Sequence, residues 1–248
     1  AQVYPTHTAA FDAAIATTLA TIPDGASKTN GLSLGHATAS DIIAWRANDN
    51  SSLVVPYTPS TDPGKWRPTP PAYAPALLPN WPYVTPFCMT SGAQFRGAGI
   101  PALDSAEYAA SFNETKSLGR LNSATRTAYQ TETAHFWADG GGTATPPGHW
   151  NLIAQSVSQE KGLTLKQNAR LFALLNISMA DAAICAWDNK YAYNAWRPIT
   201  AIQLADPAVN PLTLPDPTWV PLLTTPNFSE YVSGHSTFSG AAARLLAD

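Results

Sequence analysis

The sequence predicts an all-α fold built as a helical bundle. Apolar residues recur every three or four positions over long stretches, and the period-two alternation typical of strands is nearly absent. Serine or threonine precedes several of these stretches, where such side chains commonly cap helices. The longest helical pattern covers 164–197, and one apolar face of it holds Phe172, Leu175, Met179 and Ala183. We expect one helical domain over 1–248.

Composition and charge restrict the class of protein. Of the 248 residues, 45% are hydrophobic and 12% are charged, which is enough apolar side chain for a substantial core. The net charge is −3 and the 14 lysines and arginines form no cluster, which argues against nucleic acid as a partner. No apolar run reaches the roughly 18–20 residues of a membrane span. No membrane span is therefore expected.

The first 101 residues alternate short helices with coil. Apolar residues from Phe11 to Ile22 follow helical spacing and end at the Pro-Asp-Gly of 23–25, and a second helix is indicated at 37–48. Residues 57–101 are rich in proline, which excludes long helices and central strands. The same segment carries many aromatic side chains, unlike a flexible linker. It is expected to wrap around the bundle as ordered coil.

Four helices are expected between residue 101 and Pro198. Serine or threonine can cap three of them, and glycines at 140–142 end the second. The four helices are predicted at 105–118 with Ser105 as cap, 123–137 with Ser123 as cap, 150–161, and 164–197 with Thr164 as cap.

Lys190 and Arg197 lie seven residues apart in the last of these helices. Seven residues make about two turns, so both side chains would leave the same face about 10 Å apart along the axis. Trp187 and Asn194 share that face, and the surrounding sequence is too apolar for an ordinary exposed surface. Pro198 disfavours helical geometry at Arg197 and indicates a bend or an end there. The two cations are expected to converge on one small anion.

A second candidate element is the Ser233-Gly234-His235 turn. It leads from proline-rich coil into a helix of small residues, so Ser233 and the Gly234 amide would lie at a helix N-terminus, where free N–H groups attract anions. His235 can exchange a proton near neutral pH. Alone, the tripeptide is more typical of a helix cap beside a buried histidine than of an anion site.

Together these elements resemble the first two of three signature motifs of vanadium-dependent haloperoxidases and type 2 phosphatidic acid phosphatases. The motifs are Lys190-x6-Arg197-Pro198 and Ser233-Gly234-His235. The resemblance extends over most of the chain and is strongest for the bacterial haloperoxidase-like branch. It rests on four further segments: Gly64-Lys65-Trp66-Arg67-Pro68-Thr69-Pro70-Pro71, Phe136-Trp137-Ala138-Asp139-Gly140, Thr145-Pro146-Pro147-Gly148-His149-Trp150 and Trp187-Asp188-Asn189-Lys190-Tyr191-Ala192-Tyr193.

The resemblance implies a helical bundle of the haloperoxidase and acid-phosphatase type that oxidises halide with hydrogen peroxide. Lys190, Arg197, Ser233 and the Gly234 amide would hold the oxygens of vanadate, or of phosphate or sulfate in its place. His235 would be the acid–base residue, with Lys190 and Arg197 as the other catalytic groups. Trp187 and Phe228 match positions on the halide side of the site. The expected partners are small anions, hydrogen peroxide and halide.

Two departures from the family pattern bear on activity. Val232 stands where the family usually has proline. The third motif, Ser-Arg-x3-Gly-x-His, does not occur in 1–248, so the domain is expected to be C-terminally incomplete and no residue matches the family's vanadium-binding histidine. His149 is the candidate substitute ligand. A chain ending at Asp248 is accordingly expected to have little activity, and its bundle leaves room for a homodimer partner or a separate C-terminal fragment.

Two other functions remain open on the residues alone. An acid phosphatase of the same superfamily would use the same oxyanion site, and a truncated relative could bind anions without catalysis. A start at Ala1 without methionine, few lysines and abundant tryptophan suit a secreted or periplasmic protein. Cys88 and Cys185 have neither metal-ligand spacing nor a disulfide framework pattern, and Cys185 is expected to be a buried free thiol.

Overall fold

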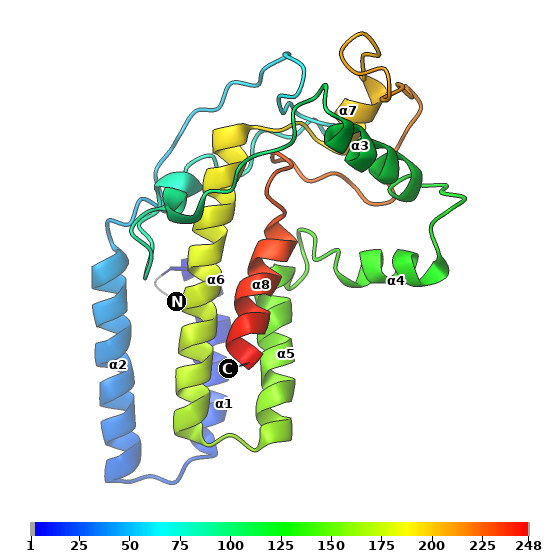
Figure 1. The fold of residues 1–248 in the computed structure, drawn as a ribbon. Coiled ribbons are helices and arrows are strands. Elements are labelled where there is room, and N and C mark those ends of the chain that lie inside the picture. Colours follow the sequence, from blue (N-terminus) through cyan, green and yellow to red (C-terminus); the bar gives the residue numbers. More distant parts are fainter. Residues whose placement is uncertain (1–2, 248) are drawn as a thin grey trace. The chain divides into compact units, whose positions relative to one another are not determined.

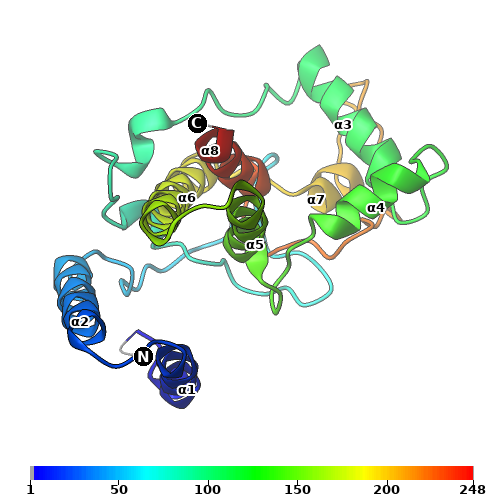
Figure 2. The same ribbon diagram turned by 90° about the horizontal axis from the view of Figure 1, so that it is seen from below.

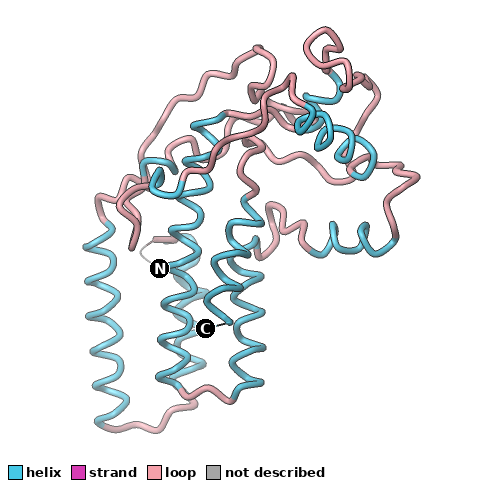
Figure 3. Tube along the Cα trace, viewed as in Figure 1, coloured by secondary structure: helices cyan, strands magenta, loops and turns pink. Residues whose placement is uncertain are grey.

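A computed structural model describes residues 3–247 and confirms the all-α fold. Helices and loops account for these residues, and pairing of strand type within them is confined to two isolated bridges, Lys65 with Ala195 and Arg120 with Pro221 (Figure 3). The chain divides into two compact units, Ala1–Asp49 and Asn50–Asp248. The single domain expected over 1–248 stays a prediction.

The first unit is a pair of helices preceded by a short 3-10 turn, η1 (Pro5–His7). Helix α1 (Thr8–Ala20) ends just before the Pro-Asp-Gly turn, as predicted. Helix α2 (Ala26–Arg46) begins eleven residues earlier than the predicted start at 37, directly after Gly25. Lys28 bonds to Asp24 at 2.8 Å across this start, so local polar contacts extend the helix where the apolar pattern is silent. Neither α1 nor α2 contains a buried residue.

The second unit starts its helical part with α3 (Ala106–Leu118) and α4 (Ala128–Phe136). Ser105 caps α3, as predicted, by accepting the Tyr108 N–H at 3.1 Å. The predicted start of the next helix at Ser123 is wrong. Ser123 instead closes a turn by accepting the N–H groups of Thr125 and Arg126. Thr127 is the actual cap, because it forms a capping box with Gln130.

Three helices lie side by side and build the main core: α5 (Thr145–Lys161), α6 (Leu165–Tyr193) and α8 (Gly234–Ala247) (Figures 1 and 2). Helix α5 begins five residues before the predicted residue 150, since prolines fit the first turn of a helix. Thr164 caps α6 through a capping box with Gln167, as predicted. The buried side chains between the three helices are Trp150, Ala154, Leu175, Met179, Ala186, Trp187, Phe238 and Ala242.

Helix α6 is long and apolar enough, by length and composition, to cross a membrane, and core helices of soluble proteins pass the same test. Here α6 packs against α5, α8 and two short 3-10 turns, η2 (Trp81–Tyr83) and η3 (Gly92–Phe95). Its buried Asp181, Asp188 and Lys190 all have polar partners in the chain. We therefore describe α6 as a core helix, and the absence of a membrane span stays a prediction.

A smaller core lies where α3 meets the short helix α7 (Pro198–Gln203) (Figure 1). Trp219 is 1% exposed there and donates its indole N–H to the carbonyl of Lys116 at 2.9 Å. Trp196 donates to the Tyr108 hydroxyl at 3.0 Å. This second core holds the segment after Arg197 in place.

The proline-rich segment 57–101 is coil apart from η2 and η3, and polar bonds hold it to one side of α6. The Asp181 carboxylate accepts three backbone N–H groups of residues 87–89, at 2.7, 2.7 and 3.1 Å.

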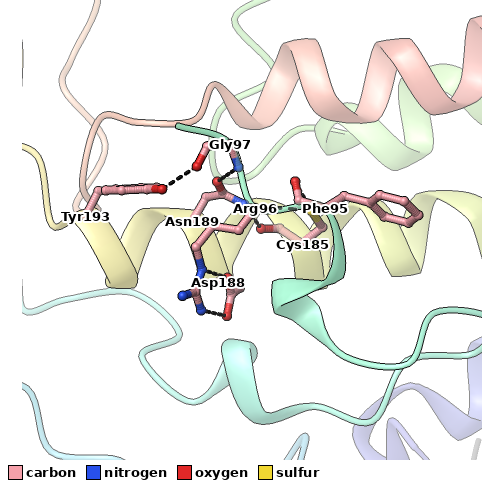
Figure 4. Close-up of polar contacts among 7 residues, drawn as sticks. All are labelled: Phe95, Arg96, Gly97, Cys185, Asp188, Asn189 and Tyr193. Atoms are coloured by element: carbon pink, nitrogen blue, oxygen red, sulfur yellow. Dashed lines mark hydrogen bonds and ion pairs between the residues drawn. The ribbon is translucent and has the colours of Figure 1, made fainter. Parts of the chain in front are cut away.

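One turn before the end of α6, Asp188 forms a two-bond ion pair with Arg96 at 2.7 and 2.8 Å, and Asn189 accepts the Gly97 N–H at 2.9 Å (Figure 4). Tyr193 donates to the Gly97 carbonyl. Carboxylates on an apolar helix thus order a loop that lacks regular structure.

Candidate functional site

The end of helix α6 corrects the predicted relation of Lys190 and Arg197. The helix stops at Tyr193, Asn194 takes the left-handed conformation with φ 52°, and Arg197 is extended as the N-cap of α7. Lys190 and Arg197 therefore do not share a helix face. Asparagine tolerates a left-handed backbone and proline excludes helical geometry from the residue before it. Pairing of 64–66 with 194–196 then holds the extended segment, with N···O distances of 2.8 and 2.9 Å.

Lys190 is buried at the end of α6, with 1% of its surface exposed. Its ammonium donates to the carbonyls of Ser229 at 2.9 Å and Glu230 at 3.1 Å, and lies 4.7 Å from the centre of the Phe228 ring. Burial and, to a smaller extent, the charge of Arg197 lower the pKa of Lys190 from 10.5 to about 7, although the charge of Glu230 raises it. The lysine is thus a cation whose charge is easily lost near neutral pH.

Arg197 reaches the same place from the extended segment. Its guanidinium carbon lies 5.5 Å from the centre of the Phe228 ring, so both cations flank one aromatic side chain although they leave different elements. The Arg197 side chain is 14% exposed, and Nη1 lies 2.8 Å from Oε2 of Glu230. Burial lowers the pKa of Arg197, and Glu230 raises it. Within residues 3–247, the buried Nε of Arg197 has no hydrogen-bond partner.

Residues 228–230 fasten this arrangement to the backbone. Ser229 is 1% exposed; its hydroxyl donates to the Lys190 carbonyl at 2.6 Å, while its own carbonyl accepts from the Lys190 ammonium. The Glu230 N–H donates to the Ala195 carbonyl at 2.9 Å. One short segment is thus bonded to α6 on one side and to the segment leading to Arg197 on the other.

The Ser233-Gly234-His235 turn begins helix α8, as predicted. Ser233 caps the helix by accepting the Ser236 N–H at 3.2 Å. Gly234 lies against Trp187, because a Cβ built on it would meet the indole ring at 3.8 Å. The turn therefore adjoins the face of α6 that carries Trp187 and Lys190. His235 is exposed, and within residues 3–247 it makes no hydrogen bond or ion pair.

The two predicted halide-side aromatics are in contact with each other. The rings of Trp187 and Phe228 lie 5.3 Å apart at 52°, and the Trp187 indole N–H donates to the Leu77 carbonyl at 3.2 Å. Lys190 lies 6.0 Å from the Trp187 ring. Apolar faces therefore cover one side of the paired cations, which strengthens any electrostatic interaction made there.

His149 is engaged elsewhere, near the start of α5. Its Nδ1 lies 3.1 and 3.2 Å from the two carboxylate oxygens of Asp139, and its ring stacks on Trp137 at 4.9 Å. A hydrogen bond at Nδ1 leaves Nε2 as the remaining ring nitrogen, but no contact joins His149 to Lys190 or Arg197 within residues 3–247. Within the same residues, no group of three His, Cys, Asp or Glu side chains could hold a metal ion. The role of His149 as a substitute ligand stays a prediction.

Sequence reasoning missed Ser229, which bonds to Lys190, and Glu230, which contacts both cations. The available signal was an acidic residue in an otherwise uncharged turn, in a chain with only 12% charged residues. The buried thiol expected at Cys185 is half-buried, and Cys88 is exposed; neither cysteine forms a disulfide.

Comparison with known proteins shows similarity to vanadium haloperoxidases. A family model described as the VCPO second helical-bundle domain matches residues 170–248, which include both motifs. The vanadium chloroperoxidase of Curvularia inaequalis is 30% identical over a region covering 51% of this chain and 24% of the chloroperoxidase. The crystal structure of the first bacterial vanadium-dependent iodoperoxidase aligns with a TM-score of 0.76 and 31% identity, covering 89% of this chain and 54% of that one.

This chain thus spans about half the length of the iodoperoxidase and about a quarter of the chloroperoxidase. Sequence and fold point to the same group of proteins, and the helical bundle matches over most of the chain. The chain is similar in sequence and fold to vanadium haloperoxidases, and its motif-bearing part matches the VCPO second helical-bundle domain.

Proposed function

We propose that this chain forms the oxyanion-binding part of a vanadate-dependent haloperoxidase, which oxidises halide with hydrogen peroxide. The observation that carries the proposal is the convergence of Lys190 and Arg197 on one ring, Phe228, from two different elements. Two cations buried side by side repel each other, and such an arrangement is typical of a site for an anion.

The donor groups fit an oxyanion. Arg197 has a buried N–H without a partner, and a guanidinium presents several donors in a fixed plane that suits tetrahedral oxyanions. Lys190 uses two hydrogen bonds on carbonyls, which leaves one of its three N–H donors. Ser233 and the Gly234 N–H supply further donors at the start of α8, where the helix dipole favours negative charge.

Each residue then has a distinct task. Lys190, Arg197, Ser233 and Gly234 would hold vanadate, and His235 would give or take a proton at an anion oxygen. Bound vanadate supplies the chemistry by which peroxide becomes able to oxidise halide. Trp187 and Phe228 keep water away from one side of the cations. The exposed position of His235 leaves its ring free to exchange that proton with solvent.

Binding of orthovanadate tests the proposal. Replacing Arg197 by alanine removes a buried charge-assisted donor, so we expect the dissociation constant measured by calorimetry to rise by about 100-fold. Arg170→Ala, an exposed arginine on α6, is the matched control and should bind as the wild type does. Equal affinity in all three proteins would contradict the proposal.

Turnover distinguishes the possible chemistries of the same site. In a bromide-oxidation assay with peroxide and orthovanadate, His235→Ala should lower any turnover of the wild type while Arg170→Ala leaves it unchanged. Hydrolysis of phosphate monoesters without bromide oxidation would instead favour the acid-phosphatase function. Binding without either activity would favour a non-catalytic anion-binding relative.

A further inference from the structure

Two unbonded polar atoms lie on the residues of the Arg197–Glu230 ion pair. Nε of Arg197 is a buried donor and Oε2 of Glu230 is a buried acceptor, and within residues 3–247 neither has a hydrogen-bond partner. Nη1 of Arg197 lies 2.8 Å from that same Oε2. These two atoms form an ion pair, but their geometry is not that of a hydrogen bond. Oε2 can therefore still accept a hydrogen bond from another group. Buried groups of this kind usually have partners, so two on one ion pair call for an explanation.

The main chain holds Glu230 in this position from both sides. Its N–H is bonded to Ala195, two residues before Arg197, and its carbonyl accepts from Lys190. The Glu230 side chain is 43% exposed while its Oε2 is buried. The carboxylate is therefore a fixed neighbour of both cations.

An adjacent free donor and free acceptor suit a ligand that offers both an acceptor and a donor. A protonated oxyanion, such as orthovanadate or phosphate near neutral pH, carries negative oxygens and at least one hydroxyl. A negative oxygen would accept from Nε of Arg197, and the hydroxyl would donate to Oε2 of Glu230. Sulfate has the same shape but no proton at neutral pH. Beside sulfate, Oε2 of Glu230 gains no hydrogen-bond donor, and the carboxylate repels the dianion.

We propose that Glu230 is a specificity-determining residue, which makes this site select protonated oxyanions and reject fully deprotonated ones. The inference rests on the proposed function, because it concerns the anion held by Lys190 and Arg197. Overall charge acts in the same direction. While Lys190 is protonated, the two cations and the Glu230 carboxylate together carry a net charge of +1, which balances a monoanion better than a dianion.

Calorimetric titration with inorganic phosphate and with sulfate tests the selection. The proteins compared are wild type, Glu230→Gln and the matched control Glu160→Gln, which changes an exposed glutamate on α5. The amide keeps the shape, can accept from a hydroxyl and can donate to sulfate. We expect wild type and Glu160→Gln to bind phosphate at least about tenfold more tightly than sulfate. Glu230→Gln should bind sulfate about tenfold more tightly than wild type does and change phosphate affinity by less than about threefold.

Other outcomes separate the two levels of the proposal. If wild type binds both anions equally well, or if Glu230→Gln changes both affinities by the same factor, the selection is overturned while the oxyanion site stands. If wild type binds neither anion nor orthovanadate, the oxyanion site itself fails. If Glu230→Gln fails to fold, Glu230→Asp is a second variant, because it keeps the negative charge. Weaker binding of sulfate than of phosphate by Glu230→Asp would then support the selection.

Discussion

Lys190→Met is expected to change the pH dependence of both stability and anion binding. In the folded chain the pKa of Lys190 is lowered to about 7 by burial, against 10.5 for an exposed lysine. Between pH 7 and 10.5, Lys190 binds its proton in the unfolded state but not in the folded state. The buried charge therefore lowers the free energy of unfolding by its full amount below about pH 7. This destabilisation disappears as pH rises toward 10.5. From pH 7 to pH 10, the free energy of unfolding of wild type should therefore rise relative to Lys190→Met by on the order of 3 kcal/mol.

Anion binding should respond in the opposite direction. The ammonium is charged below its pKa of about 7, so orthovanadate or phosphate should bind wild type more weakly as pH rises through that value. Lys190→Met should bind weakly at every pH and lose the part of this dependence that comes from the lysine, leaving the part that comes from the anion's own protons. Urea unfolding and calorimetry at matched pH values measure the two effects. A constant difference in stability between the two proteins from pH 7 to 10 would contradict the lowered pKa.

Asp181→Ala is expected to give the largest loss of stability. The carboxylate is 6% exposed and accepts the N–H groups of Phe87, Cys88 and Met89, so its removal leaves three donors without their acceptor. A hydrogen bond to a charged group contributes about 1.5–3 kcal/mol, so loss of three part-buried bonds should lower the free energy of unfolding by about 3 kcal/mol or more. Urea unfolding measures the change, and hydrogen exchange should accelerate first in residues 87–97.

The matched control is Asp104→Ala, an exposed aspartate before α3, which should change stability by less than about 0.5 kcal/mol. Equal stability of Asp181→Ala and Asp104→Ala would mean that segment 87–97 does not depend on α6 for its order. Faster exchange throughout the chain, with no early opening of 87–97, would mean that the carboxylate supports the whole fold instead.

The sequence by itself determined the fold class, the main helices and the two motifs that resemble those of vanadium haloperoxidases. Helical periodicity and the caps Ser105 and Thr164 are local signals, because a helix forms between residues three and four apart. The motif of 233–235 likewise depends on one turn and the helix that follows it. Local patterns failed where polar contacts replaced apolar spacing, as at the early start of α2 and at the cap Thr127.

Only the tertiary structure decided how the two cations meet. The seven-residue spacing predicted a shared helix face, whereas α6 ends at Tyr193 and Arg197 approaches Phe228 from an extended segment. That segment is fixed by its pairing with 64–66 and by the bond from Glu230 to Ala195, contacts that join residues far apart in the chain. Packing of distant segments also buries Lys190, which lowers its pKa, and places Glu230 beside Arg197. Burial and ion pairing depend on which distant segments surround a side chain, and spacing along one segment does not specify them.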